Sequence, residues 1–239
     1  MNTNRKNLKK WTAGIGAICM LSFFSSCLKD NNANYTPPPT ALVSFVQASP
    51  DEQPIDLYFN ANKVNRMPLV YGNELDYFRA YVGNRIVNIY TENSTGNKLV
   101  SDTITLKQDS VYSLFMVNTS ASPQILLVHD SLSNPGTGNA GIRFINVSPD
   151  ASSVDLAVHG GSVLVSDKAF KGYSSFIKVP TNKSYTFDVR QAGTNTVLAT
   201  LSDITPTSGF MYTIWFHGLA GGTNSLDKLG VDIITNAYY

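Results

Sequence analysis

A short element that occurs twice places the strongest constraint on the fold of this 239-residue chain. Ser49-Pro50-Asp51 is followed by Ile55-Asp56-Leu57, and Ser148-Pro149-Asp150 is followed by Val154-Asp155-Leu156. Both parts of the element recur at the same offset, 99 residues. A fixed offset of this size is typical of two tandem copies of one module, each of about a hundred residues.

The pattern of the chain after its N-terminus predicts an all-β fold. Short segments with alternating apolar residues, rich in Val, Ile, Tyr and Phe, are separated by Asn, Gly, Ser, Pro and Asp, which favours antiparallel sandwiches over helices. In the first module we expect strands near residues 41–48, 54–59, 75–81, 85–92, 98–105, 110–118 and 124–129. In the second we expect them near residues 141–147, 153–158, 163–170, 174–179, 183–190, 196–202, 210–217 and 229–235.

Alignment of the two copies shows what the fold requires. Val43 and Phe45 fall on Ile142 and Phe144, so apolar residues recur at core-like spacing while the polar residues between them differ. Trp215 falls on Phe115 in an apolar strand and is expected to be buried. We place the first domain at residues 41–133 and the second at 141–239. The linker between them, residues 134–140, is rich in Gly and Asn and predicts some relative motion.

The N-terminus has the features of an export signal. Four basic residues precede an apolar run, Trp11 to Phe24, and the small residues Ser25 and Ser26 lead to Cys27. The run is shorter than the ~20 residues that a membrane-spanning helix needs. It resembles bacterial lipoprotein signals of the Bacteroidota type, with Phe24 in place of the usual leucine. The resemblance implies a signal peptide at residues 1–26, lipidation of Cys27, and a Pro-rich tether at residues 27–40.

Removal of this signal changes the charge and the thiol content. Four of the 18 basic residues and none of the 17 acidic residues lie before Cys27, which leaves 14 against 17 and a net charge of −3. A mildly acidic protein is a poor nucleic-acid binder, so we expect no such partner. Cys19 lies within the signal and Cys27 would carry lipid. Each domain is therefore expected to depend on its core rather than on disulfides.

The repeated element has a structural and a functional interpretation. Proline favours a turn, and the side chains of Ser49, Asp51, Ser148 and Asp150 can bond nearby backbone N–H groups. Asp56 and Asp155 begin the next strands, where a carboxylate can accept hydrogen bonds from turn N–H groups. The functional alternative is a cation site that uses Asp51, Glu52 and Asp56 in one copy and Asp150 and Asp155 in the other. Calcium takes about six to eight oxygen ligands, and Ala151 replaces Glu52 in the second copy, which has therefore lost a ligand.

These residues also carry a family resemblance. The run from Ile142 to Leu156, the pairs Gly172-Tyr173 and Val179-Pro180, and the late Tyr212-Thr213 step are similar to the DUF4397 family, domains of unknown function in bacterial exported proteins. The first copy departs from the pattern at Tyr81-Val82-Gly83. The resemblance covers nearly all of residues 41–239 and implies an Ig-like or transthyretin-like sandwich. It implies no catalytic residues.

The search for catalytic or metal-binding residues finds little. His129, His159 and His217 each stand among apolar or glycine neighbours, without the spacing of zinc ligands. The segment around Ser174 lacks the second glycine of a hydrolase elbow, and Glu74 and Glu92 have no repeated partner for glycoside cleavage. We therefore predict a protein that is not an enzyme and needs no cofactor or metal, with an envelope hydrolase as the least favoured alternative.

Tyrosines outside the core pattern favour a binding role. Exposed rings suit stacking on sugars or on proteins. The tyrosines without a clear core assignment are Tyr35, Tyr58, Tyr71, Tyr81, Tyr90, Tyr173, Tyr238 and Tyr239. The leading hypothesis is a lipid-anchored binding or interaction module at the outer membrane, on its periplasmic or cell-surface side, and the alternative is an accessory carbohydrate-binding lipoprotein. Its partner would be the membrane, through the lipid, and an envelope protein or glycan.

Three short patterns in the first module suggest a covalent modification. Thr103, Ser110 and Ser131 each follow an aspartate and precede an apolar residue. This order resembles the acceptor of Bacteroidota O-glycosylation, so these hydroxyls are candidate attachment sites.

Overall fold

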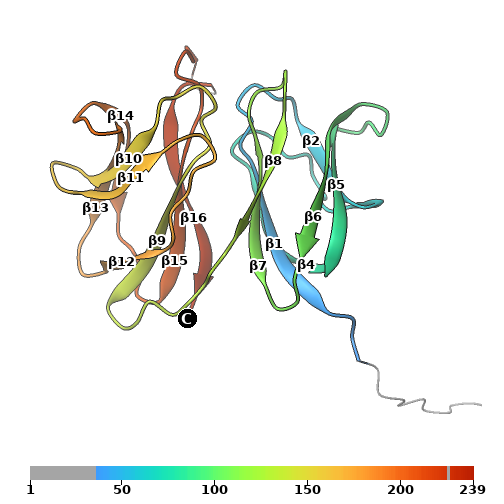
Figure 1. Ribbon diagram of the computed structural model, residues 1–239, viewed down its shortest axis with the longest axis horizontal. Helices are drawn as coiled ribbons and strands as arrows, with labels where there is room; N and C mark the ends of the chain where they lie inside the picture. Colours follow the sequence, from blue (N-terminus) through green and yellow to red (C-terminus); the bar gives the residue numbers. More distant parts are fainter. Residues whose placement is uncertain (1–35, 225–226) are drawn as a thin grey trace, which may run out of the picture. The chain divides into compact units, whose positions relative to one another are not determined.

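The computed structural model describes residues 36–224 and 227–239, and within these ranges it contains sixteen strands and no helix (Figure 1). The predicted signal peptide, Cys27 and the tether up to Tyr35 lie outside the described residues. The first eight strands are β1 (Thr40–Gln47), β2 (Ile55–Phe59), β3 (Asn62–Lys63), β4 (Glu74–Tyr81), β5 (Gly83–Thr91), β6 (Lys98–Leu106), β7 (Val111–Val117) and β8 (Gln124–His129). The next eight are β9 (Asn139–Asn146), β10 (Val154–Val158), β11 (Val163–Lys168), β12 (Ile177–Pro180), β13 (Tyr185–Gln191), β14 (Val197–Ile204), β15 (Phe210–His217) and β16 (Gly230–Tyr238).

These strands form four sheets in two sandwich-like halves, which confirms the predicted all-β class. In the first half, sheet A (order β4-β1-β7-β8) faces sheet B (order β3-β2-β5-β6). In the second half, sheet C (order β12-β9-β15-β16) faces sheet D (order β11-β10-β13-β14). Adding eight to each strand number of the first half gives the second, so the two halves share one connectivity. Every predicted strand overlaps an observed one, and only the two-residue β3 was not predicted.

The sheets are mostly but not purely antiparallel, so the prediction of antiparallel sandwiches was incomplete. β1 pairs with β7 in parallel, with Val43 opposite Tyr112, and β9 pairs with β15 in parallel, with Ile142 opposite Tyr212. The same residues in each half therefore lie side by side at the centre of the inner sheet. Their side chains belong to the two sandwich cores, which include Phe45, Leu57 and Ile89 in the first half and Phe144, Leu156 and Phe187 in the second.

Sheets A and C are buried on both faces. Val46, Phe115 and Val128 on sheet A and Ile145 and Trp215 on sheet C form a third apolar cluster, separate from the two sandwich cores. Alternate residues of a strand point to opposite faces, so Phe45 enters the core of its own sandwich while Val46 meets the other half. Trp215 is buried, as predicted, but in this shared cluster rather than in a sandwich core, and the equivalent Phe115 is buried there too.

Polar side chains continue the same interface. The guanidinium of Arg143 on sheet C forms a buried ion pair with Asp130 (2.5 Å) and donates to the hydroxyls of Ser113 (3.2 Å) and Thr213 (2.8 Å). Asn236 Nδ2 donates to the Tyr77 hydroxyl (2.9 Å). Pro38–Tyr239 forms one compact unit. The shared apolar cluster and the buried ion pair join the two halves, an interface that the linker at residues 134–140 did not indicate.

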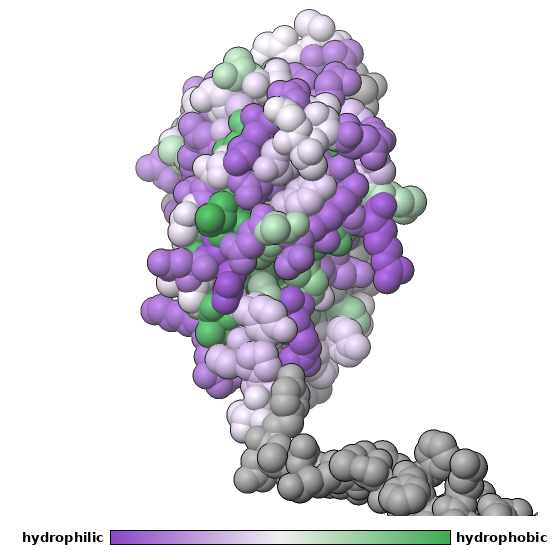
Figure 2. Space-filling view, turned by 90° about the vertical axis from the view of Figure 1, so that its right-hand side faces the viewer, coloured by the Kyte–Doolittle hydropathy of each residue, from purple (hydrophilic) through white to green (hydrophobic). Residues whose placement is uncertain are grey.

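Sheets B and D present their outer faces to solvent. Figure 2 views the side of sheet B, where hydrophilic residues predominate and hydrophobic ones form only small separate patches. In residues 36–224 and 227–239 we find no helix with the length and apolarity needed to cross a membrane.

Candidate functional site

The repeated Ser-Pro-Asp element connects distant loops. The carboxylate of Asp51 accepts hydrogen bonds from the backbone N–H (2.8 Å) and the hydroxyl (2.9 Å) of Ser120, in the loop after β7. Asp150 accepts a bond from the N–H of Ala220 (2.8 Å), in the loop after β15. The partners are not the nearby N–H groups that the turn pattern predicted. The aspartates instead join the turn after the first strand of each half to the loop after the seventh.

Asp56 and Asp155 hold turn backbones in both halves. The two carboxylates accept hydrogen bonds from the N–H groups of Asn93 and Gly193, respectively, each at 3.0 Å. Asp56 also pairs with the ammonium of Lys63 (2.7 Å). Burial raises the pKa of Asp56, but hydrogen bonds from Lys63, Asn65 and Asn93 outweigh burial and hold that pKa below its usual value.

The cation interpretation of the element receives no support from this geometry. Asp51 and Asp56 bind different protein groups, and the described part of the chain contains no group of three His, Cys, Asp or Glu side chains that would hold a metal ion. The Glu52 carboxyl is partly buried, and burial followed by the neighbouring Asp51 charge raises its pKa. The carboxylates are therefore arranged to brace the loops of each half.

Two of the three histidines have acidic partners that their sequence neighbours did not reveal. His159 Nδ1 lies 3.1 Å from both carboxylate oxygens of Asp188. His217 Nε2 lies 3.1 Å from Asp232, and its Nδ1 bonds the Tyr71 hydroxyl at 2.5 Å, so this group connects the two halves. Burial, followed by the charges of Asp232 and Asp227, raises the pKa of Tyr71 well above its usual value. This shift favours the protonated form of the Tyr71 hydroxyl.

The other candidate catalytic groups are also occupied or isolated. Ser174 Oγ accepts a hydrogen bond from the N–H of Phe144 (3.0 Å) and so supports the backbone of β9. Glu74 has an acidic neighbour that we did not predict. Burial, followed by the charge of Asp76, raises the pKa of Glu74.

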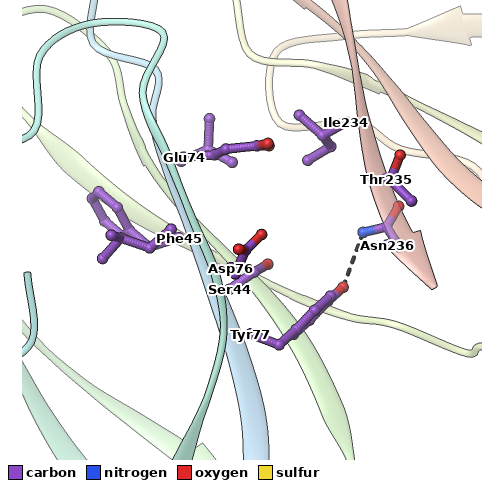
Figure 3. A pocket seen from close by; sticks show the side chains of 10 residues that line it. Ser44, Phe45, Glu74, Asp76, Tyr77, Ile234, Thr235 and Asn236 are labelled. Atoms are coloured by element: carbon purple, nitrogen blue, oxygen red, sulfur yellow. Dashed lines mark hydrogen bonds between the residues drawn. The ribbon is translucent and has the colours of Figure 1, made fainter.

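Glu74 and Asp76 lie beside a small pocket between β4 and β16 (Figure 3). Tyr77 and Asn236 form its hydrogen-bonded wall, and Glu74 extends from β4 toward Ile234. The cavity volume is about 20 Å³. This space holds about one water molecule, so the pocket is too small for an organic ligand.

A wider groove of about 710 Å³ lies along β4 on the first half. Its floor includes Val64, Leu69 and Phe78, which pack in or against the first sandwich core. Its rim carries both charge signs, from Arg66 and from Glu74 and Asp76, and the side chain of Met67 is 78% exposed there. The groove can admit an aliphatic group, but its mixed rim favours no one class of ligand.

The tyrosines that the sequence left unassigned do not form one cluster. Tyr71 is engaged with His217, and Tyr35 lies outside the described residues. The exposed rings of Tyr81, Tyr173, Tyr238 and Tyr239 are distributed over both halves. Tyr58 and Tyr90 form the exception, because their ring centroids are 5.3 Å apart on sheet B.

The outer face of sheet B brings these two tyrosines together with uncharged polar groups. Tyr58 lies opposite Asn88 in the β2–β5 register, and Asn88 lies opposite Ser101 in the β5–β6 register. Ser101 donates to Asn88 Oδ1 (2.7 Å), and the Lys98 ammonium lies 5.6 Å from the Tyr90 ring centroid. We call this group (Tyr58, Asn88, Tyr90, Lys98 and Ser101) the sheet B patch.

The equivalent face of sheet D carries an ionic cluster. Asp188 is buried and accepts hydrogen bonds from Arg190 (3.2 Å) and Thr200 (3.1 Å), with His159 beside it. Burial raises the pKa of Asp188, but hydrogen bonds from these three residues outweigh it and hold the pKa below its usual value. Because these charged groups already bind one another, this face offers few free partners to a ligand.

The candidate O-glycosylation sites differ in exposure. Thr103 and Ser131 are exposed, whereas Ser110 is half-buried. Thr103 lies on the edge strand β6 of sheet B, and its N–H bonds the Asp102 side chain (2.7 Å). The hydroxyls of Thr103 and Ser131 are therefore sterically available.

Comparison with known proteins finds a family model that matches part of the chain. Residues 41–157 match the family described as "Domain of unknown function (DUF4397)". The match covers the first half and continues into β10 of the second. No curated protein matches the chain.

Solved structures show similarity at the level of fold only. A family CBM26 module from Eubacterium rectale Amy13K, in complex with maltoheptaose, is 10% identical, covers 83% of this chain and 97% of its own, and has a TM-score of 0.24. A structure titled "Alpha-glucan binding by a streptococcal virulence factor" is 12% identical, covers 75% of this chain and 92% of its own, and has a TM-score of 0.23. Identities and scores this low transfer no ligand.

Proposed function

We propose that this chain is a non-enzymatic binding module of a bacterial envelope. Residues 41–157 match DUF4397, a family without an assigned activity, so the support for this function comes from the surface itself. The observation that carries the proposal is the difference between the outer faces of sheets B and D. The sheet B patch presents two tyrosines, two uncharged polar side chains and one lysine, whereas the residues of the Asp188 cluster on sheet D bind one another. The sheet B patch is the ligand surface, and the second half supports it.

The chemistry of the described residues supports a non-catalytic role. Ser174 accepts a hydrogen bond from the backbone, His159 faces the carboxylate of Asp188, and burial favours the protonated form of Tyr71, the hydroxyl beside His217. A hydrolase needs a nucleophile beside its base, or two carboxylates on either side of a cleft. The wide groove has its carboxylates on one strand, β4.

The proposal includes the lipid on Cys27, which places the module at the outer membrane, on either its periplasmic or its cell-surface side. Twelve residues, Leu28 to Pro39, separate this cysteine from the start of β1. A chain of this length reaches at most roughly 40 Å, which is enough to display the first half beyond the lipid headgroups. The second half is then a second copy of the same module with a scaffolding role.

The ligand surface is tested by site-specific photo-crosslinking in cells. A crosslinker at Ile86, on β5 two residues before Asn88, is compared with one at Val197 on sheet D, since these side chains are 47% and 45% exposed. We expect crosslinks to an envelope component from position 86 and none from position 197. Equal yields at both positions, or none at 86, would contradict the proposal. Cys27→Ala is the anchor control and should leave the membrane fraction.

A further inference from the structure

The two tyrosines of the sheet B patch form an aromatic corner. Their rings meet at an interplanar angle of 79°, and both side chains are half-buried, so each ring is held in place and partly open to solvent. Neither hydroxyl has a hydrogen-bond partner within residues 36–224 and 227–239. The corner thus offers both an apolar ring surface and unused polar groups. A sugar ring needs this combination, because its C–H face is apolar and its rim carries hydroxyls.

Asn88 provides fixed hydrogen-bonding groups beside the corner. Asn88 is 8% exposed, and its side chain accepts a hydrogen bond from Ser101 (2.7 Å) and donates one to the backbone oxygen of Asn60 (3.3 Å). An amide has two N–H donors and two acceptor lone pairs, so one of each stays free on Asn88. Ser101 can still accept a bond through its hydroxyl oxygen. These groups are oriented before any ligand arrives, which lowers the entropy lost on binding.

The charge of the patch matches an uncharged ligand. Asp56, which lies opposite Tyr90 in the register, is buried and paired with Lys63. Where sheet D has Asp188 opposite Thr200, sheet B has Asn88 opposite Ser101. The single unpaired charge is the Lys98 ammonium, which lies against Tyr90. An acidic ligand would find one cation, whereas a neutral, hydroxyl-rich ligand finds a complete set of partners.

We propose that Tyr58, Asn88, Tyr90 and Ser101 form a binding site for an uncharged oligosaccharide. This inference rests on the proposed function and names its ligand class. The two rings pack against C–H faces of the sugar, and Asn88 and Ser101 bind its hydroxyls. The second half lacks the site because Ala157 lies opposite Asp188, where Tyr58 lies opposite Asn88 in the first.

The test uses the full-length protein in detergent and affinity electrophoresis against a panel of polysaccharides. The panel contains neutral α-glucan, β-glucan, mannan and xylan, with alginate as an acidic probe. We expect retardation by at least one neutral polysaccharide. Tyr58→Ala and Tyr90→Ala should each weaken it roughly tenfold or more, since buried aromatic contacts dominate such interfaces. Tyr81→Ala is the matched control, because Tyr81 is exposed on the same half but lies on β4 of sheet A.

Tyr58→Phe keeps the ring and removes the hydroxyl, so it should bind better than Tyr58→Ala, and circular dichroism checks that each variant is folded. Four results would overturn the inference: no neutral polysaccharide is bound, alginate is bound more tightly, Tyr58→Ala and Tyr90→Ala bind like the wild type, or Tyr81→Ala loses as much binding as they do. If any of these results occurs while position 86 still crosslinks an envelope component, the proposed binding function stands and only the ligand class is wrong. If the protein shows neither polysaccharide binding nor a crosslink from position 86, the proposed function is wrong as well.

Discussion

The outer faces of sheets B and D share one backbone arrangement and differ in chemistry. Asn88 and Ser101 on sheet B lie in the same register as Asp188 and Thr200 on sheet D, and the hydroxyl bonds its partner in both halves. Tyr90 and Arg190 each stand two residues further along the strand. The inward residues keep the fold, so the outward ones are free to change. The face of sheet D carries an internal ionic cluster, and the face of sheet B carries neutral polar groups.

The difference has an energetic consequence. A charge that leaves water is costly unless it is paired, so Asp188 and Arg190 depend on each other. Asn88 and Tyr90 carry no charge, and removing one leaves no uncompensated ion beside the other. Sheet D thus contributes to stability through its outer face. Sheet B retains neutral polar groups, and a ligand can use the donors and acceptors that the Ser101–Asn88 bond leaves free.

The largest expected effect is on the stability of the second half. Asp188→Ala leaves the buried Arg190 guanidinium without its carboxylate, and we expect a loss of about 3 kcal/mol in the free energy of unfolding. Asn88→Ala removes only neutral hydrogen bonds and should cost about 1 kcal/mol. Urea unfolding of the two variants measures both values. Equal costs would show that the faces do not differ in the way we describe.

A second prediction concerns pH and uses Asp188→Asn, which gives sheet D the residue of sheet B. The pKa of Asp188 lies below its ordinary value of 3.8 in the folded protein. Its stabilising contribution is therefore complete above that value and is lost as the pH falls through the folded pKa. The wild type should be more stable than the variant at pH 6, and the gap should narrow below about pH 4. A gap that is constant down to pH 2.5 would contradict this account.

Sequence reasoning located the strands because alternation is a local property. It missed β3, since Asn62 and Lys63 have no apolar residue to mark them, and it missed the parallel pairing of β1 with β7, which depends on connectivity. It also missed the interface between sheets A and C. Arg143 alternates with apolar residues and looks solvent-facing in sequence, yet it is buried against Asp130 of the other half.

The candidate site was visible only in part. Tyr58 and Tyr90 were both named as unassigned tyrosines, but their contact depends on the β2–β5 register, which short patterns do not fix. Asn88 and Ser101 gave no signal at all, because an asparagine or a serine in a strand is common. The comparison of two copies supplied what one copy lacked, since equivalent positions with different residues show where the two outer faces differ in chemistry.

The smallest expected effect compares the serines of the repeated element. Asn118, directly after β7, and Gly218, directly after β15, both have a left-handed backbone, with φ of +73° and +87°. Ser148 donates its hydroxyl to the Gly218 oxygen (2.7 Å), whereas the buried Ser49 hydroxyl has no partner among the described residues. Ser148→Ala should therefore cost about 1 kcal/mol, and Ser49→Ala should be neutral or slightly stabilising. Thermal unfolding of both variants decides, because equal losses would mean that the two hydroxyls have equivalent partners in solution.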